Sequence, residues 1–333
     1  MNVTKSGAVV QDSLSKKKFG LAEYFQSRQN IFQNFGSLFA LIILVVVISL
    51  IRPEFMTTWN FLSILRQASV NGLIAFGMTG VILVGAIDLS VGSVLALSSI
   101  LCAAMIAAGV DVPVAFALAL LLGTAMGFIS GMLVTAGRLQ PFIATLVTMV
   151  VFRGLTLIAS QGRPISNLGD HALLVGLGRG DFLSVPIPVW ILGITFAIYF
   201  FILHKTTLGR QIYGTGSNIA AAAIAGVRVN RIKIIVYCIS GFFASLAGLV
   251  LLSRLGSAQP TLGTGFELDA IAAVVLGGTS MSGGRGRIYG TLIGVLIIAV
   301  LNSGMNIIGV QSFSQNVVKG LVILIAVLLD RNR

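Results

Sequence analysis

Long apolar stretches are the feature that most constrains the fold of this chain. The clearest, none of which carries a charged residue, include 39–51, which extends back to Gly36, 112–136, 185–203 and 289–308. A helix needs about 20 predominantly apolar residues to cross the hydrocarbon core of a bilayer. A membrane β-barrel would instead show short segments of alternating polarity, and the sequence has none. The pattern therefore predicts an all-α polytopic membrane protein.

The composition supports the same class and argues against a nucleic-acid partner. Only 10% of the residues are charged, against about 25% in soluble domains. The net charge is +12, but no basic run is interleaved with aromatic residues, the pattern typical of nucleic-acid binding. The two cysteines, Cys102 and Cys238, fall in apolar segments, so we expect them to pack rather than to form a disulfide framework.

Hydropathy predicts about ten spans, some of them broken or half helices. The eighth is too short to cross the membrane comfortably, so we expect a half-span or a broken helix there. The predicted ranges are 37–51, 68–87, 91–108, 112–136, 141–159, 185–203, 232–253, 268–280, 289–308 and 315–329.

The basic residues orient these spans. If the N-terminus is cytoplasmic, most Lys and Arg side chains fall in cytoplasmic segments, as the positive-inside rule requires. Both termini are then predicted to be cytoplasmic, with the basic loop 204–232 inside and the loop 160–184 outside. Residues 1–35 form a cytoplasmic tail, either disordered or containing an interfacial amphipathic helix. Residues 36–330 form the membrane domain.

A first break interrupts the apolar sequence at 85–93, GAIDLSVGS. Irregular backbone at membrane depth survives only where protein or water surrounds it, and an acid there normally faces the interior of the bundle. Asp88 has two compatible roles. The favoured one is to cap a helix starting near Leu89, because Asp is a preferred N-cap residue. The alternative is direct contact with a transported solute.

A second break lies at 275–294, VLGGTSMSGGRGRIYGTLIG. It weakly echoes the first, because Ser90 and Gly92 have counterparts in Ser282 and Gly284. Repeated halves with broken helices are typical of transporters, so the chain could contain two internally repeated halves. Ordinary close helix packing explains any single glycine equally well.

Polar side chains within or near the spans suggest a path for a solute. They either bond neighbouring helices or line a route for a neutral hydroxylated molecule. Arg153 and Lys319 also fall within spans, and the segment 253–270 is expected to form the outer rim. The candidate pathway residues are Asn71, Asp88, Ser90, Gln259, Glu267, Asp269, Asn302 and Asn306, of which the last two share a helix face.

Catalytic signatures are missing from the sequence. There is no HExxH, GxSxG or CxxC motif, and the predicted topology puts the two histidines on opposite sides of the membrane. No Gly-Lys pair exists for a Walker A motif. We therefore expect a transport subunit with no catalytic residue, metal or cofactor of its own. Any ATP would be bound by a partner subunit.

The cytoplasmic loop contains a candidate docking helix. The segment 217–225 begins with two capping residues, Ser217 and Asn218, and Gly226 closes it. Its surface is small because alanine occupies 220–223. Such a helix could lie in a groove of a soluble partner, and the alternative is a solvated loop with basic membrane anchors.

Five long segments carry a resemblance to a known family. They are VNGLIAFGMTGVILVGAIDLSVGS at 70–93, GRLQPFIATLVTM at 137–149, LGRQIYGTGSN at 208–218 with AGV at 225–227, SAQPTLGTGFELDAIAAVVLGGTSMSGGRGRIYGTLIG at 257–294, and NIIGVQSFSQNVVKGLVILIAVLLD at 306–330. In these segments the chain resembles the membrane permeases of bacterial ABC importers for monosaccharides, most closely those for ribose. The resemblance covers nearly the whole chain from about residue 36 onward.

This resemblance implies a permease of the bacterial cytoplasmic (inner) membrane that imports ribose or a related monosaccharide by alternating access. Its implied partners are an ABC ATPase, an extracytoplasmic sugar-binding protein, a second permease chain and membrane lipid. The sequence alone leaves open a stand-alone secondary transporter or facilitator of a small polar solute. The residues implied to couple to the ATPase are Gly209, Arg210, Gly216, Ser217, Asn218, Ala221 and Gly226.

Overall fold

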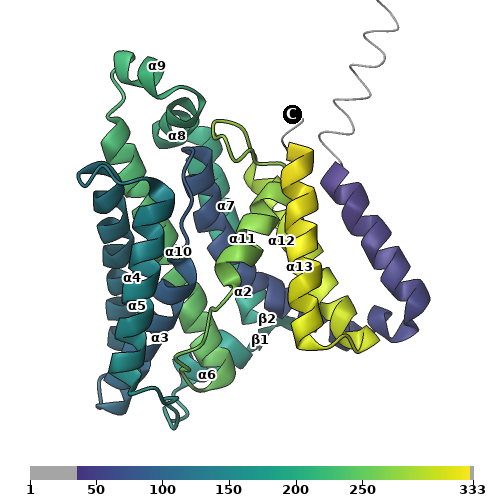
Figure 1. Ribbon diagram of the computed structural model, residues 1–333. Coiled ribbons are helices and arrows are strands. Elements are labelled where there is room, and N and C mark those ends of the chain that lie inside the picture. The colour runs from purple at the N-terminus through teal and green to yellow at the C-terminus, as the bar shows by residue number, and fades with distance from the viewer. Residues whose placement is uncertain (1–35, 331–333) are drawn as a thin grey trace, which may run out of the picture.

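The computed structural model describes residues 36–330, and nearly all of them belong to helices (Figure 1). The predicted tail, 1–35, lies outside the described residues. The helices are Gly36–Ile51, η1 (Pro53–Met56), α2 (Thr58–Leu83), α3 (Val91–Ala107), α4 (Val112–Thr135), α5 (Pro141–Ser160), α6 (Ala172–Arg179), α7 (Ile187–Lys205), α8 (Thr207–Ser217), α9 (Ile219–Ile224), α10 (Val229–Leu255), α11 (Phe266–Leu276), α12 (Ile288–Ile308) and α13 (Ser312–Asp330).

Six of these helices are long and apolar enough to cross a membrane: α2, α4, α5, α7, α10 and α12. Two shorter apolar helices are Gly36–Ile51 and α3. Every predicted span overlaps a helix, and the short eighth one corresponds to α11, which has 11 residues. The predicted all-α class needs one small addition, because β1 (Asp181–Phe182) and β2 (Val185–Pro186) form an antiparallel pair.

Helix α2 begins ten residues before the predicted span 68–87, so the helix includes Arg66, which was expected outside the span. The helix begins at Thr58, where Thr57 caps it by accepting a hydrogen bond from the Asn60 N–H at 3.3 Å. Arg66 lies within the helix and forms an ion pair with Asp181 at 3.1 Å. This ion pair links α2 to the 160–184 loop, far along the chain.

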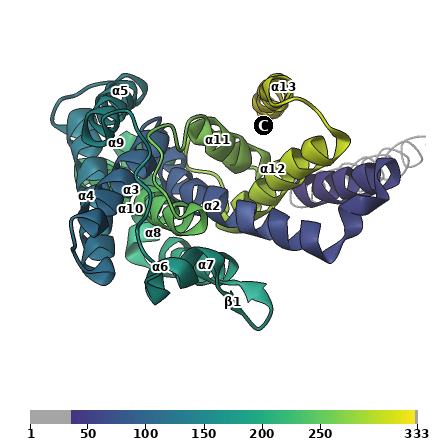
Figure 2. The same cartoon turned by 90° about the horizontal axis from the view of Figure 1, so that it is seen from below.

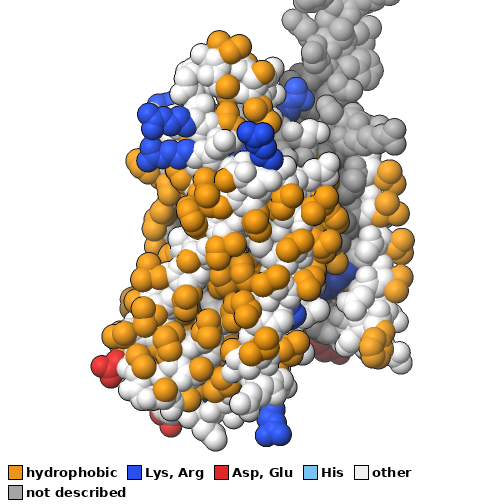
Figure 3. Space-filling view, turned by 60° about the vertical axis from the view of Figure 1, so that its left-hand side comes forward, with side chains coloured by type: hydrophobic (Ala, Val, Ile, Leu, Met, Phe, Trp, Pro, Cys, Tyr) orange, Lys and Arg blue, Asp and Glu red, His pale blue; other side chains and the backbone are white. Residues whose placement is uncertain are grey.

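Helices α2 and α10 are the most deeply buried of the long helices. Close packing of α10 on α4 depends on glycine: a Cβ added to Gly127 would lie 2.2 Å from the carbonyl oxygen of Tyr237. Small residues let helix backbones approach in this way in membranes, where no hydrophobic effect drives helices together. Figure 3 shows apolar side chains spread over the visible face, as expected for a surface in contact with lipid.

The two ends of the bundle differ in structure. One end carries α8 and α9, and the described chain also begins and ends there (Figure 1). We call it the α9 end. The opposite end carries α6 and the β1–β2 pair, and we call it the α6 end. Helix α13 and the helix Gly36–Ile51 lie on the side away from α4 and α5 (Figures 1 and 2).

Candidate functional site

Two irregular segments enter the bundle from opposite ends and meet in its interior. The first, 84–90, joins α2 to α3, and the second, 256–265, joins α10 to α11. A Cβ added to Gly92 would lie 2.2 Å from the carbonyl oxygen of Gly263, and both glycines are buried. Part of the segment predicted as the outer rim, 253–270, therefore runs inward against α3, while Thr261 and Thr264 within it stay exposed.

Asp88 is the polar centre of the first segment and is 1% exposed. Its Oδ1 accepts hydrogen bonds from the Ser90 N–H at 3.0 Å and from the Ser90 hydroxyl at 2.6 Å. Its Oδ2 accepts from the hydroxyl of Ser240 at 2.8 Å. Ser240 lies near the middle of α10, so Asp88 sits deep within the bundle.

The prediction that Asp88 caps a helix starting near Leu89 is wrong in detail. Helix α3 begins at Val91 with Ser90 at its N-cap, and the side chain of Ser90 caps no helical N–H group. Asp88 lies two residues before that cap and stabilises the turn that leads into it. Its bond to Ser240 also ties this turn to α10. The carboxylate thus positions two elements, a broader structural role than capping one.

Further side chains satisfy the backbone of the first segment. The carbonyl oxygen of Ile87 accepts hydrogen bonds from the Tyr237 hydroxyl at 3.2 Å and the Thr145 hydroxyl at 3.3 Å. These residues come from α10 and α5. Irregular backbone within a bilayer requires such internal partners. The segment is therefore held in a defined shape by its neighbours.

Arg153 holds the second segment, and the sequence analysis noted it only as a charge inside a span. One terminal nitrogen of its guanidinium, from α5, donates to the carbonyl oxygens of Pro260 and Leu262, both at 2.8 Å. The carboxylate of Glu267 accepts from the Gly265 N–H at 3.2 Å. Its other oxygen lies close to Gly92, where an added Cβ would approach it to 2.6 Å. An arginine in an apolar helix was the signal that could have flagged Arg153, although not its partners.

Asp269 of α11 and Lys319 of α13 form an ion pair at 2.9 Å. The Asp269 side chain is 7% exposed and that of Lys319 is 24% exposed. Ionised side chains at membrane depth are costly unless they are paired. Asp269 therefore has a partner that the sequence analysis did not connect with it, and α13 gains an anchor on α11.

The other pathway candidates do not gather in one place. Asn71 is buried in α2, and Gln259 is half-buried in the second segment. Asn302 is buried in α12, and its side-chain oxygen has no hydrogen-bond partner among residues 36–330. Asn306 is exposed and accepts a hydrogen bond from Gln315 at 2.8 Å. Asn302 and Asn306 thus lie in different environments, one buried and one exposed, although they were predicted to share a helix face. Only Asp88 with Ser90, and Glu267 near Gly92, lie at the meeting point of the two segments.

The docking helix predicted at 217–225 corresponds to α9. The Asn218 side chain caps α9 by accepting from the Ala221 N–H at 3.0 Å. Gly226 follows it with a φ of +82°, a conformation that favours glycine. The predicted cap at Asn218 and helix end at Gly226 are therefore confirmed. Ser217 was wrongly predicted as a cap, because it is the last residue of α8 and its hydroxyl donates to the Tyr213 carbonyl at 2.9 Å.

The predicted coupling residues divide by exposure. Gly209 is buried and Gly216 half-buried, so both pack inward. Two apolar residues that the sequence analysis did not select are more exposed than expected: Ile219 is 50% exposed and Ile224 is 89% exposed. Both side chains belong to the short helix α9. The exposed coupling candidates are Arg210, Ser217, Asn218, Ala221 and Gly226.

Three backbone segments meet where α8 ends: the ends of α8 and α2 and the 277–287 loop. The Gly284 N–H donates to the Leu83 carbonyl at 2.9 Å, and a Cβ added to Gly216 would lie 1.8 Å from that same oxygen. The Tyr213 hydroxyl donates to the Gly286 carbonyl at 2.9 Å. Burial raises the pKa of the Tyr213 phenol, so it keeps the proton that it donates. Helix α8 is thus joined directly to the end of α2 and to the 277–287 loop.

Comparison with known proteins places this geometry in context. A family model described as "Branched-chain amino acid transport system / permease component" matches residues 60–327. The ribose import permease protein RbsC of Bacillus subtilis (strain 168) is 55% identical over 303 residues, covering 91% of this chain and 94% of that protein. RbsC of Escherichia coli (strain K12) is 52% identical over 299 residues, covering 89% and 93%. The D-allose transport system permease protein AlsC of the same strain is 41% identical over 325 residues, covering 97% of each. No solved structure matches the chain.

Proposed function

Since this chain belongs to the family of branched-chain amino acid transport system permease components, we propose that it is the membrane permease subunit of an ATP-driven ABC importer for ribose. One observation carries the choice of sugar. Ribose permeases from two organisms are 55% and 52% identical to the chain, whereas the D-allose permease is 41% identical. A stand-alone secondary transporter is not favoured by these relatives.

The partners follow from this role. The α9 end faces the cytoplasm and binds the ABC ATPase, which binds ATP and carries out its hydrolysis. The exposed Ile219 and Ile224 and the three-backbone contact at Gly216 support this surface. The α6 end faces outward toward a sugar-binding protein. A second copy of the permease completes the pore within the lipid of the inner membrane.

Charge supports this orientation of the molecule. In Figure 3, Lys and Arg side chains gather around the α9 end of the visible face. Arg210, Arg228 and Arg231 are exposed in or next to α8, α9 and the start of α10. Cytoplasmic segments of membrane proteins are enriched in basic residues. Both termini then lie on the cytoplasmic side.

The transport path runs where the two irregular segments meet. Helix α2 runs from the α6 end to the α9 end, and the 84–90 segment then turns back into the bundle. Helix α10 runs the opposite way, and the 256–265 segment turns back from the α6 end. This relation supports two internal halves of inverted orientation. The sugar would pass the contact of Gly92 with Gly263 as the two halves alternate between inward and outward access.

Reconstituted transport tests the proposal. The chain is placed in proteoliposomes with its cognate ATPase and sugar-binding protein, and uptake of radiolabelled ribose is followed. We expect uptake to require ATP and both partners. The variant Ile224→Glu should lose the ATPase in a mild-detergent pull-down, whereas Ile224→Ala should retain much of it. Ribose uptake by the chain alone, driven by an ion gradient, would instead identify a secondary transporter.

A further inference from the structure

A polar cavity of about 420 Å³ opens at the α6 end, between the 160–184 loop and the end of α10. Small-molecule sites typically have volumes of about 300–1,000 Å³, so a monosaccharide fits at the lower end of this range. None of the predicted pathway residues lies in this cavity. Its polar lining comes from Asn167, Asp170, Arg179 and Ser253, and Leu174 and Val175 form an apolar wall.

Ser253 gives the cavity an unused hydrogen-bonding group. The residue is 1% exposed, and its hydroxyl has no hydrogen-bond partner in the described part of the chain. Buried polar groups are nearly always paired with protein or with bound molecules. Because the hydroxyl itself has almost no accessible surface, the Ser253 side chain has to turn toward the cavity before a ligand hydroxyl can become its partner.

Arg179 is fixed at the edge of the same cavity. Its Nε donates to the carbonyl oxygen of Arg254 at 3.0 Å, which orients the guanidinium plane. Its Nη2 lies against Gly256, where an added Cβ would approach it to 2.5 Å and where the φ is +68°. Glycine at this position can adopt the left-handed backbone conformation that ends α10. It also leaves room for the guanidinium group of Arg179.

The chemistry of the lining matches a neutral polyol. Asp170 is an acceptor, Arg179 is a donor, and Asn167 and Ser253 can each do both. The one positive and one negative group balance, and no ion pair joins Asp170 to Arg179 among the described residues. An anion would be repelled by Asp170, whereas sugar hydroxyls donate and accept in turn. A bound sugar would bridge the two charges that the protein leaves apart.

The cavity also adjoins the root of the 256–265 segment. Ile165 and Ala258 exchange backbone hydrogen bonds, both at 2.9 Å, which ties the 160–184 loop to this segment. Gly256 lines the cavity directly. A molecule bound here contacts both the outer loop and the chain that leads inward to Gly263.

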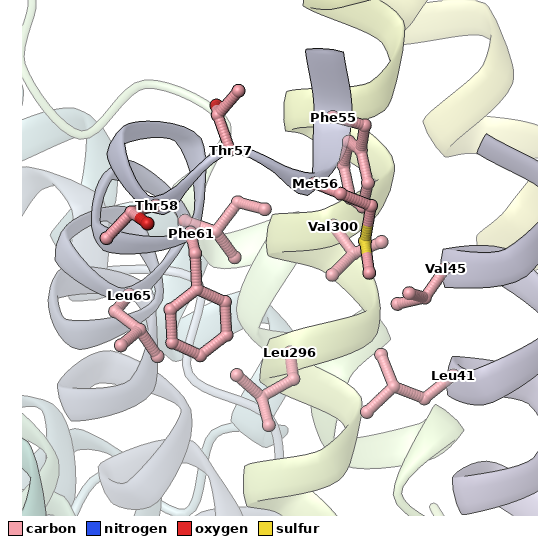
Figure 4. Close-up of a pocket in the computed structure, with 11 residues that line it drawn as sticks. Leu41, Val45, Phe55, Met56, Thr57, Thr58, Phe61, Leu65, Leu296 and Val300 are labelled. Atoms are coloured by element: carbon pink, nitrogen blue, oxygen red, sulfur yellow. The ribbon is translucent and has the colours of Figure 1, made fainter. Parts of the chain in front are cut away.

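We propose that this cavity binds one neutral monosaccharide at the outer entrance of the permease. The inference rests on the proposed function, since it assumes that the α6 end receives the sugar. A second pocket, of about 400 Å³, does not match a sugar (Figure 4). Its lining is apolar except for Thr57 and Thr58, so it offers too few partners for several hydroxyl groups.

Thiol protection tests the site on the full chain in nanodiscs, without the binding protein. Cys102 and Cys238 are replaced by alanine, and Val175→Cys puts a reporter on the half-exposed cavity wall. D-ribose should slow the reaction of this thiol with a water-soluble maleimide, and the effect should saturate with ribose concentration. Ser184→Cys, exposed at the turn between β1 and β2, is the matched control and should react at an unchanged rate.

Ser253→Ala separates binding from folding. Removing the hydroxyl should raise the ribose concentration for half-protection by about fivefold, the worth of one hydrogen bond. The melting temperature should stay the same or rise, because an unpaired buried hydroxyl is removed. Unchanged labelling of Val175→Cys in ribose, or unchanged half-protection in Ser253→Ala, overturns the site. Ribose uptake by the complete importer is measured separately, so uptake without protection refutes the cavity and leaves the proposed function intact.

Discussion

Gly92 and Gly263 touch backbone to backbone in the interior of the bundle, although they lie far apart in sequence. A Cβ added to Gly92 would lie 2.2 Å from the Gly263 carbonyl oxygen, and one added to Gly263 would lie 2.5 Å from the Gly92 carbonyl oxygen. Each glycine therefore makes room for the other. The contact joins the first turn of α3 to the segment before α11. It fixes how deeply the two irregular segments enter the molecule.

Gly92→Ala should disrupt this crossing. The new methyl group would also lie 2.6 Å from the Glu267 carboxylate, so backbone has to move to admit it. We expect a loss of about 1–3 kcal/mol in the free energy of unfolding, typical of overpacking, and a marked loss of ribose uptake. Thermal unfolding in detergent measures the first. Gly193→Ala in α7, where the added Cβ meets no atom within 4 Å, is the control and should be tolerated.

Asp88→Asn and Asp88→Leu should behave differently. Asparagine keeps an oxygen for Ser90 and can donate to the hydroxyl of Ser240, so stability and uptake should stay near normal. Leucine leaves buried donors unpaired, each costing about 1–3 kcal/mol. Uptake and unfolding temperature are compared with the same pair of changes at Asp111, which is exposed and caps no N–H group with its side chain. Near-normal uptake from both Asp88 variants would refute the structural role of this carboxylate.

Arg153→Met should release the 256–265 segment from α5. The carbonyl oxygens of Pro260 and Leu262 would lose a charged donor, and such hydrogen bonds are worth about 1.5–3 kcal/mol each. Ribose uptake should fall, and Arg153→Lys should restore part of it because it retains the charge. Arg163, an exposed residue of the 160–184 loop, is the matched control for both changes. Equal uptake from Arg153→Met and the unmodified chain would show that the two hydrogen bonds are dispensable.

The ion pair of Asp269 with Lys319 can be distinguished from a contact with the sugar. Lys319→Met alone leaves an acid unpaired, which should cost about 3 kcal/mol. The double variant Asp269→Asn with Lys319→Met removes both charges and should recover most of the stability and uptake. A double variant that folds well but does not transport ribose would instead place Asp269 in the transport path. Thermal unfolding and uptake together decide between these outcomes.

Local sequence patterns predicted the elements better than their contacts. The apolar runs located the helices, and the short α11 was expected as a broken or half span. The Asn218 cap and the Gly226 end of α9 were also correct, because these residues act on backbone within a few positions of themselves. Asp88 was correctly placed in a break, but its bond to Ser240 depends on how α10 packs.

The contacts that define the site join residues distant in sequence. Ser240 follows Asp88 by 152 residues, and Pro260 follows Arg153 by 107. Nothing in the spacing of polar residues specifies such pairs. The outer cavity was missed for the same reason, since the packing of α6 against the end of α10 isolates the hydroxyl of Ser253. The sequence could flag each charge in an apolar segment but could not name its partner.

The meeting of Leu83, Gly216 and Gly284 has a mechanical consequence. A side chain at an interface can change rotamer and absorb small displacements, whereas backbone atoms in contact have no such freedom. At this junction no side chain separates the end of α8 from the end of α2. We therefore expect a displacement of α8 to be passed directly to the end of α2 and to the 277–287 loop.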